Sequence, residues 1–354
     1  MTDGSERVIS DLVEREIDRI TDQRVVEKIR PLLVTPTGGP FLIDPGVSKV
    51  RWPSFRAKIK GMLFERLGAA GALVLVFAIG FRADAESVPG VDLANNLSPD
   101  SNLERSLRSV VEGLGLTGPA AEKRLAVSLA DVTNRQHVRY AGLNDREMMY
   151  AASLPKICAL VAGFERIQGG QLQYTPAVKE MFTRMVRYSS NADASRAIHT
   201  VGFDYISRVL TSPKYRLYDP AQNGGLWLGK AYGGTGDYWK RDPLHHLSHG
   251  ATSLQVARFF LLLQEGRLVN PQYSAEIKEI LSKPGLRHKF VKGLEGRDCE
   301  IYRKSGTWSR YHADSALVEH GGKTYIAVAL MEDEQGGAIF PQLIQKLDDL
   351  IMRQ

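Results

Sequence analysis

Candidate strands lie near both ends of residues 101–354, and helical segments lie between them. Strand-like apolar patterns cover Arg124–Val132, His137–Ala141, Glu300–Gly306, Ala313–Glu319 and Thr324–Leu330. Helical spacing covers a segment near 101–115, the middle from Ser153 to about Leu281, and a closing segment over Ile339–Ile351. Because strands from both ends must pair, we expect an α+β fold: one antiparallel five-stranded sheet flanked by helices, beside an all-helical region.

An apolar stretch over 67–81 (LGAAGALVLVFAIGF) suggests how the chain is divided. It is shorter than the roughly 20 residues of a membrane span, basic residues precede it, and Ala83-Asp84-Ala85 follows. We therefore predict a signal peptide or membrane anchor over 62–85, an N-terminal extension over 1–61 and one folded domain over 86–354. Either Met62 is the functional start, or residues 1–61 are a cytoplasmic extension of an anchored form. The protein is expected to be exported, to the periplasm or outside the cell.

Composition excludes several classes of partner. The net charge is only +6, and basic residues do not cluster with aromatic ones, so no nucleic-acid partner is expected. The two cysteines, Cys158 and Cys299, lack zinc-site spacing, and we expect two separate buried thiols. Histidines 245, 246 and 249 could bind a metal, but capping or solvated roles are favoured, so neither metal nor cofactor is expected.

The segment 153–156 (SLPK) places Ser153 and Lys156 three residues apart, just before an apolar helical run over 157–164. The two side chains then lie on one face, one turn apart. A lysine whose pKa is lowered by burial can take the proton of a serine hydroxyl, and the helix N-terminus suits a developing oxyanion. A capping serine beside a solvated lysine is the ordinary alternative.

Two further motifs follow. The segment 188–191 (YSSN) lies between helical stretches and offers a second hydroxyl and an amide, although serine and asparagine also cap helices. The segment 304–307 (KSGT) ends a predicted strand, where glycine permits close approach of a ligand and lysine can pair with a carboxylate. A strand end with a small bulge is the alternative there.

In this order and context, the three motifs resemble those of class A β-lactamases and penicillin-binding serine hydrolases, over about residues 101–354. The stretch 249–281 is similar to that family's helical pair after the omega loop. The resemblance implies these roles: Ser153 as nucleophile, Lys156 as base, Ser189 as proton shuttle, Asn191 on the acylamino side chain, and Lys304, Ser305 and Thr307 on the substrate carboxylate. It also implies an oxyanion hole from the N–H groups of Ser153 and of a residue after Gly306, for which we take Trp308.

The sequence departs from that family in three places. The segment that should carry the deacylating glutamate is best matched by 219–223 (DPAQN), which offers Asp219 and Asn223, or merely a turn. The spacing from Ser153 to Ser189 is shorter than usual, which suggests an open cleft. Residues 224–250 form a Gly- and aromatic-rich insertion that we expect to cover or reshape the site.

The leading hypothesis is a β-lactamase that hydrolyses β-lactam amide bonds through an acyl-enzyme on Ser153. One alternative is a penicillin-binding-type D,D-peptidase or esterase that acts on cell-wall peptides or other acyl substrates. Another is a non-hydrolytic binding protein with the same fold. The expected partner is a small β-lactam or a cell-wall peptide, and the expected state is a monomer.

Overall fold

The computed structural model describes residues 97, 99–234 and 238–353. The chain divides into two compact units, Met1–Val91 and Asp92–Gln354, and every described residue belongs to the second. The predicted extension over 1–61 and the apolar stretch 67–81 lie outside the described residues. Among the residues that are described, no helix is both long and apolar enough to cross a membrane.

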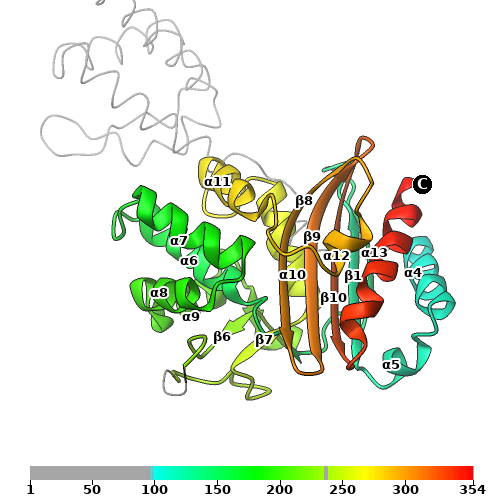
Figure 1. Cartoon of the computed structure of the whole chain (residues 1–354), viewed down its shortest axis with the longest axis horizontal. Helices are drawn as coiled ribbons and strands as arrows, with labels where there is room; N and C mark the ends of the chain where they lie inside the picture. The colour runs from blue at the N-terminus through cyan, green and yellow to red at the C-terminus, as the bar shows by residue number, and fades with distance from the viewer. Residues whose placement is uncertain (1–96, 98, 235–237, 354) are drawn as a thin grey trace, which may run out of the picture. The chain divides into compact units, whose positions relative to one another are not determined.

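A five-stranded antiparallel sheet forms the centre of this unit, in the order β2-β1-β10-β9-β8 (Figure 1). Its strands are β1 (Leu125–Asp131), β2 (Arg139–Leu143), β8 (Cys299–Trp308), β9 (Tyr311–His320) and β10 (Lys323–Glu332). Strands from the two ends of the unit meet where β1 pairs with β10. The predicted fold class and all five predicted strands are confirmed.

Alternation along the strands gives the sheet two apolar faces. In β1, Val127 and Leu129 belong to one buried cluster, and Ala126 and Ala130 belong to the other. The first face is covered by α4 (Ser101–Gly113) and α13 (Gly336–Met352), with the short helices α5 (Thr117–Ala121) and α12 (Phe290–Gly293) nearby (Figure 1). The second face is covered by α10 (Ser253–Gln264). The sheet is therefore the middle layer between helices.

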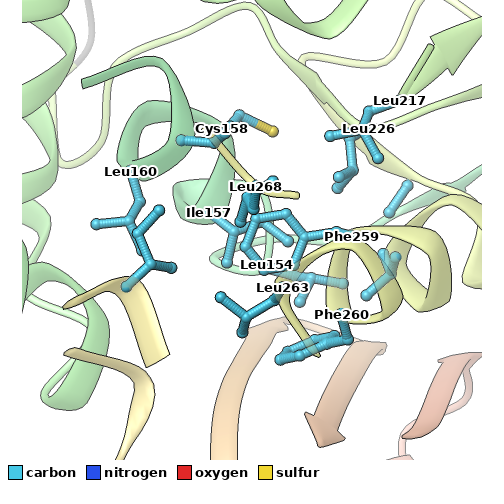
Figure 2. Packing of buried hydrophobic residues seen from close by; sticks show 14 of the residues in the cluster. Leu154, Ile157, Cys158, Leu160, Leu217, Leu226, Phe259, Phe260, Leu263 and Leu268 are labelled. Atoms are coloured by element: carbon cyan, nitrogen blue, oxygen red, sulfur yellow. The ribbon is translucent and has the colours of Figure 1, made fainter. Parts of the chain in front are cut away.

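The helical region lies beside the sheet and contains α6 (Lys156–Gln168), α7 (Pro176–Arg187), α8 (Asn191–Val201), α9 (Phe203–Thr211) and α11 (Pro271–Leu281) (Figure 1). Its core is continuous with the α10 face of the sheet. Figure 2 shows Leu154 and Ile157, at the start of α6, packed with Phe259 and Phe260 of α10. This packing fixes the start of α6 against the sheet.

Short strands interrupt the helical middle of the chain, and the sequence patterns did not predict them. They are β3 (Met149–Tyr150), β4 (Tyr218–Asp219), β5 (Gly224–Gly225), β6 (Trp227–Leu228) and β7 (His249–Ala251), with a 3₁₀ turn over Pro220–Gln222. The pairing of β3 with β7 brings residues 249–251 beside the segment that leads to Ser153. At two or three residues each, these strands are too short to show a period-2 pattern.

Both cysteines are free, as expected. Cys158 is fully buried in α6, within the cluster on the α10 side of the sheet. Cys299 is only half-buried and packs against the cluster on the opposite face.

Candidate active site

Ser153 occupies a turn immediately before α6. The turn begins at Ala152, whose φ of 49° is left-handed, and the N–H of Lys156 donates to the carbonyl of Ser153 at 3.3 Å. The first turns of α6 are apolar all round, so the helix is buried on every side there and Lys156 is drawn into the interior with an exposure of 0%. Ser153 itself faces a cavity. The predicted position of the pair at a helix start is therefore correct.

Lys156 Nζ reaches across to the segment before α8. It donates to the carbonyl of Ser189 at 2.6 Å, to Asn191 Oδ1 at 2.8 Å and to Ser189 Oγ at 3.3 Å. The ring of Tyr232 covers it at 4.4 Å from the centroid. Burial lowers the Lys156 pKa to about 7. A sizeable fraction of this amine is therefore neutral, and able to accept a proton, at neutral pH.

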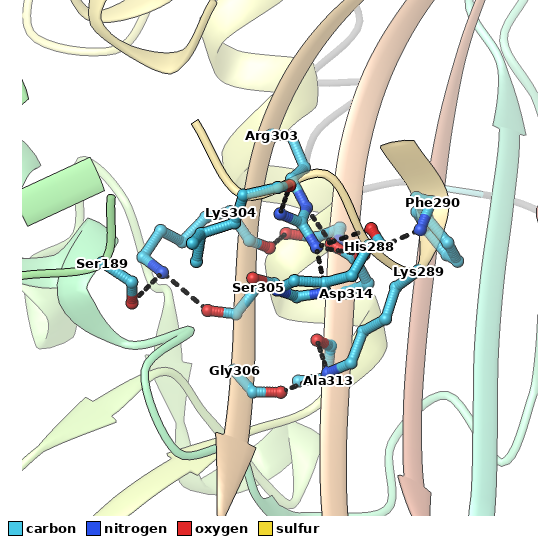
Figure 3. Close-up of polar contacts among 12 residues, drawn as sticks. Ser189, His288, Lys289, Phe290, Arg303, Lys304, Ser305, Gly306, Ala313 and Asp314 are labelled. Atoms are coloured by element: carbon cyan, nitrogen blue, oxygen red, sulfur yellow. Dashed lines mark hydrogen bonds and ion pairs between the residues drawn. The ribbon is translucent and has the colours of Figure 1, made fainter. Parts of the chain in front are cut away.

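Lys304, which lies in β8, also reaches Ser189. Its Nζ donates to Ser189 Oγ at 3.0 Å and to the carbonyl of Ser305 at 2.6 Å (Figure 3). Burial lowers its pKa well below the usual value, with Lys156 contributing in the same direction. Ser189 Oγ thus lies between two lysine amines. The sequence placed Ser153, Lys156, Ser189, Asn191 and Lys304 at one site, and the fold brings the last four into a single hydrogen-bonded group beside Ser153.

Gly306 lets β8 approach the turn that carries Ser153. A Cβ at position 306 would lie 2.1 Å from the carbonyl oxygen of Ala151 and 2.8 Å from the backbone nitrogen of Ser153. Both contacts are shorter than any side chain tolerates, so only glycine fits without a backbone shift. The KSGT motif is therefore packed directly against the backbone of the nucleophile turn.

The register of β8 decides which N–H faces this turn. Trp308 pairs with Tyr311 at the end of the hairpin, and Thr307 pairs with His312. The carbonyl of Ser305 accepts from Lys304 Nζ and so is turned away from β9. Backbone groups of alternate residues in a strand point the same way, so the N–H of Thr307 points to the free edge, and that of Trp308 points to β9. The N–H that points to the free edge after Gly306 is therefore that of Thr307 and not that of Trp308, which the sequence analysis chose. Trp308 lines the cavity with a side chain that is 65% exposed.

A buried polar cluster supports β8 from behind, and the sequence patterns missed it. Lys289 Nζ donates to the carbonyl of Gly306 at 2.6 Å, to Thr307 Oγ1 at 2.8 Å and to the carbonyl of Ala313 at 3.2 Å (Figure 3). Burial lowers the Lys289 pKa to about 8.

Next to it, Arg303 and Asp314 form a two-pronged buried ion pair, with both distances 2.7 Å (Figure 3). The contacts of Lys289 and of the Arg303–Asp314 pair join residues 11 to 24 positions apart in the sequence, so no local motif predicts them.

The cavity in front of Ser153 has a volume of about 710 Å³. Described residues of the 224–250 segment, in 230–234, 238 and 247–249, form part of its wall. The described residues that line it are Tyr150, Ala152, Ser153, Asn191, Lys230, Ala231, Tyr232, Gly233, Gly234, Tyr238, Leu247, Ser248, His249, Thr307, Trp308 and Tyr311. None of these described lining residues is an aspartate or a glutamate.

Asp219 and Asn223 do not share this cavity. Asp219 lines a separate space of about 90 Å³, accepts from Arg216 Nη2 at 2.6 Å and caps the 3₁₀ turn by accepting from the N–H of Ala221 at 3.0 Å. Asn223 adopts a left-handed φ of 61°, and its amide donates to the carbonyl of Arg146 at 2.8 Å. The DPAQN segment therefore forms the turn that its sequence also suggested, away from the lining of the Ser153 cavity.

Three residues from outside the motifs line the cavity and contact one another in pairs, and they were not predicted as catalytic or substrate-binding residues. His249 is 4% exposed, and its ring lies 4.4 Å from that of Tyr232, centroid to centroid. Tyr232 donates to the carbonyl of Ala152 at 3.1 Å, and Ser248 contacts His249 Nδ1 at 3.1 Å. Within the described residues no group of three or more His, Cys, Asp or Glu side chains is placed to hold a metal ion.

Comparison with solved structures supports the fold. PBP-A has 15% sequence identity and a TM-score of 0.55, with 73% of this chain and 100% of that chain covered. A mutant of PBP-A, described as an acyl-enzyme complex with penicillin G, has 15% identity and a TM-score of 0.54, with 73% and 99% covered. A class A β-lactamase from Bacteroides cellulosilyticus DSM 14838 has 16% identity and a TM-score of 0.54, with 71% and 99% covered.

A search of curated proteins finds no match to this chain. The sequence model of the beta-lactamase enzyme family matches residues 175–354, just over half of the chain. The matched region includes Ser189, Asn191 and the KSGT segment, and it begins after Ser153 and Lys156. Together with the five-stranded sheet and its flanking helices, this match shows that the chain is a serine hydrolase that belongs to the beta-lactamase enzyme family.

Proposed function

We propose that the protein forms an acyl-enzyme on Ser153, with Lys156 as the base that accepts the proton of the hydroxyl. The observation that carries this proposal is the buried Lys156 amine, one turn from Ser153, with a pKa lowered to about 7. In the reaction, Ser153 Oγ attacks the carbonyl carbon of an amide, and its proton passes to the Lys156 amine. The amide C–N bond then breaks, and the leaving nitrogen takes a proton through Ser189 Oγ, which lies between Lys156 and Lys304.

The substrate we propose is a β-lactam or a cell-wall peptide that carries a carboxylate. Lys304, Ser305 and Thr307 follow closely in sequence near the end of β8, where the Lys304 amine reaches Ser189 Oγ and Thr307 lines the cavity. A carboxylate bound there would meet this amine and these hydroxyl groups. The N–H groups of Ser153 and Thr307 would stabilise the oxyanion. Asn191 is available for an acylamino group once its hydrogen bond to Lys156 exchanges.

The described lining of the Ser153 cavity favours the penicillin-binding type of activity, with slow hydrolysis of the acyl-enzyme, over rapid β-lactam turnover. Class A β-lactamases use a glutamate to activate the deacylating water, and none of the described residues lining the Ser153 cavity is acidic. Asp219 is held by Arg216 in another cavity. The same site would then act as a peptidase or esterase on acyl substrates. Export through residues 62–85 remains part of the proposal, since a cell-wall substrate is met outside the cytoplasm.

The test is a time course of intact protein mass after mixing with penicillin G, with Ser153→Ala as control. We expect an adduct on the native protein that persists for many minutes, and none on the variant. An adduct that clears within seconds would favour rapid β-lactamase turnover. Absence of an adduct would contradict the acyl-enzyme proposal for β-lactams.

A further inference from the structure

We infer that Ser248 and His249 form a proton relay in the Ser153 cavity, which activates the water that releases the acyl group. Ser248 would contact the water, and His249 would act through Ser248. This inference rests on the proposed function, because it concerns the second half of the same reaction. The family's usual deacylation residue is a glutamate, so the relay is a feature of this chain's own loop.

The hydrogen bonds of His249 fix which ring nitrogen carries the proton. Nε2 lies 3.0 Å from the carbonyl oxygen of Lys230, and a carbonyl oxygen can only accept, so Nε2 bears the hydrogen. Burial lowers the His249 pKa to about 4, so the ring is neutral at physiological pH. Nδ1 is then an acceptor, and its partner is Ser248 Oγ at 3.1 Å. Ser248 therefore donates to the ring, and its oxygen, which also shares a hydrogen bond with the Tyr150 side chain, has a second lone pair for a further donor.

The pair is held beside the nucleophile by the backbone. The N–H of Ala151, two residues before Ser153, donates to the carbonyl of His249 at 2.9 Å. Both Ser248 and His249 line the cavity into which Ser153 faces.

The surroundings of the imidazole keep it neutral and in place. Tyr232 packs on the ring at 4.4 Å, and Tyr150 meets it edge-on at 5.9 Å. The charged groups that act on the ring are Lys230, from the loop, and Lys156, from α6, and both disfavour its protonation. A neutral base whose acceptor nitrogen is bonded to Ser248 is thus placed in a cavity whose described lining offers no carboxylate.

The proposed step conserves atoms and charge. The oxygen of water bonds to the carbonyl carbon of the Ser153 ester, while a water proton moves to Ser248 Oγ and the Ser248 proton moves to His249 Nδ1. The tetrahedral intermediate then expels Ser153 Oγ, which takes a proton that Lys156 has drawn from solvent after the leaving nitrogen departed, so that Lys156 ends neutral as it began. His249 returns its proton through Ser248 to solvent. The products are a carboxylic acid and the free serine.

The experiment separates acylation from deacylation by mass spectrometry of the intact protein. Native protein, His249→Gln and Ser248→Ala are acylated with penicillin G, freed of excess reagent, and followed for a day. Glutamine retains a donor for the Lys230 carbonyl but cannot accept a proton from Ser248 in the same way. His246→Gln, at an exposed histidine of the same loop, is the matched control.

We expect both variants to acylate within about threefold of the native rate and to deacylate about a hundredfold more slowly. His246→Gln should behave as the native protein, and Ser248→Thr, which restores a hydroxyl, should recover most of the lost rate. Hydroxylamine attacks an ester without needing a base, so it should release the adduct from His249→Gln as fast as from the native protein. That last result excludes a merely distorted or closed site.

Equal deacylation rates in native protein and His249→Gln would overturn the inference and leave the acyl-enzyme proposal standing. A native adduct that does not decay within a day would also overturn the relay and leave the acyl-enzyme proposal standing. Failure of the native protein to acylate would overturn the proposed function itself, and the relay with it.

Discussion

Lys156 is a buried amine that the described residues do not pair with a carboxylate. Its three hydrogen-bond acceptors are two oxygens of Ser189 and one of Asn191, all of them uncharged. Desolvation is therefore not offset by an ion pair, and the pKa falls to about 7. The burial that disfavours the protonated form of Lys156 also leaves a neutral amine that can accept a proton.

The acylation rate should accordingly follow the ionisation of Lys156. Only the neutral amine accepts a proton, so the rate should rise as pH increases through about 7 and then level off. Stopped-flow acylation by penicillin G from pH 5.5 to 9 measures this profile. Lys156→Arg should lose a hundredfold or more, while Lys292→Arg, at an exposed position, should not change. A flat profile would contradict the role of Lys156.

Asp219 should be dispensable for turnover. Asp219→Asn removes the charge that pairs with Arg216, but that pair belongs to a cavity separate from the one at Ser153. We expect deacylation of the penicillin adduct within about twofold of the native rate. An adduct that persists ten times longer in Asp219→Asn would show that the carboxylate does reach the acyl group.

Lys289 should stabilise the end of β8. Lys289→Met removes the donor shared by the carbonyls of Gly306 and Ala313 and by the Thr307 hydroxyl. Unsatisfied buried acceptors cost about 1–3 kcal/mol, and we expect the free energy of unfolding in urea to fall by that amount. Lys292→Met, three residues on and exposed, is the control. Equal stability of the two variants would contradict the supporting role.

At this scale, sequence reasoning predicts the relative placement of two side chains where both lie within one short motif. Ser153 and Lys156 are one helical turn apart, and their relation needs no tertiary information. The assignment of Asp219 misled because aspartate before proline is also a good cap for a turn, and here it caps one. The sequence offered His249 only as a candidate metal ligand and did not single out Lys289, because most of their partners, in the 229–234 loop segment, β8 and β9, are brought near only by the fold.

At the scale of elements, β8 is the part on which the site depends most. It is an edge strand of the sheet, and its free edge meets the turn at Ser153 through Gly306. An edge strand normally exposes unpaired backbone groups, and here those groups face the cavity. The sheet thus supplies donors to the site without a dedicated loop.

Gly306→Ala tests this contact between elements. A Cβ at 2.1 Å from the Ala151 carbonyl must push β8 away from the turn, and a displacement of about 1 Å can cost a hundredfold in rate. We expect acylation to slow at least that much. Gly118→Ala, where the new Cβ meets nothing within 4 Å, should leave the rate unchanged. A native rate in Gly306→Ala would show that the oxyanion donors do not depend on this packing.

Elements with a long periodic pattern were predictable, and the short ones were not. The five sheet strands and α13 have at least five residues each and repeat their apolar positions, so the sequence pattern predicted which segments are strands and which is a helix. Strands β3 to β7 have two or three residues each: β4 pairs with β5 and β6 with β7 inside the 218–251 segment, and β7 also pairs with β3, far earlier in the chain. The pairing of these strands places residues 247–249 in the cavity wall. It depends on tertiary contacts, so no local sequence pattern predicts it.

At the scale of the whole molecule, the site lies where three separate parts of the fold meet. The turn before α6 gives Ser153 and Lys156, the segment before α8 gives Ser189 and Asn191, and β8 gives Lys304 and Thr307. Each part is anchored in one continuous core, with α10 between the sheet and the helical region (Figure 2). This arrangement holds the proposed catalytic groups on packed elements, and described residues of 230–234 and 247–249 line the cavity beside them.

The most direct test of the account is to locate the acyl group. Native protein is treated with penicillin G, quenched in acid, digested with trypsin and mapped by mass spectrometry. Ser153, Ser189 and Ser248 fall on three different tryptic peptides, which cover 147–156, 188–196 and 242–258. The account predicts the added penicilloyl mass on the 147–156 peptide alone. Modification of either of the other two peptides, with 147–156 unmodified, would contradict it.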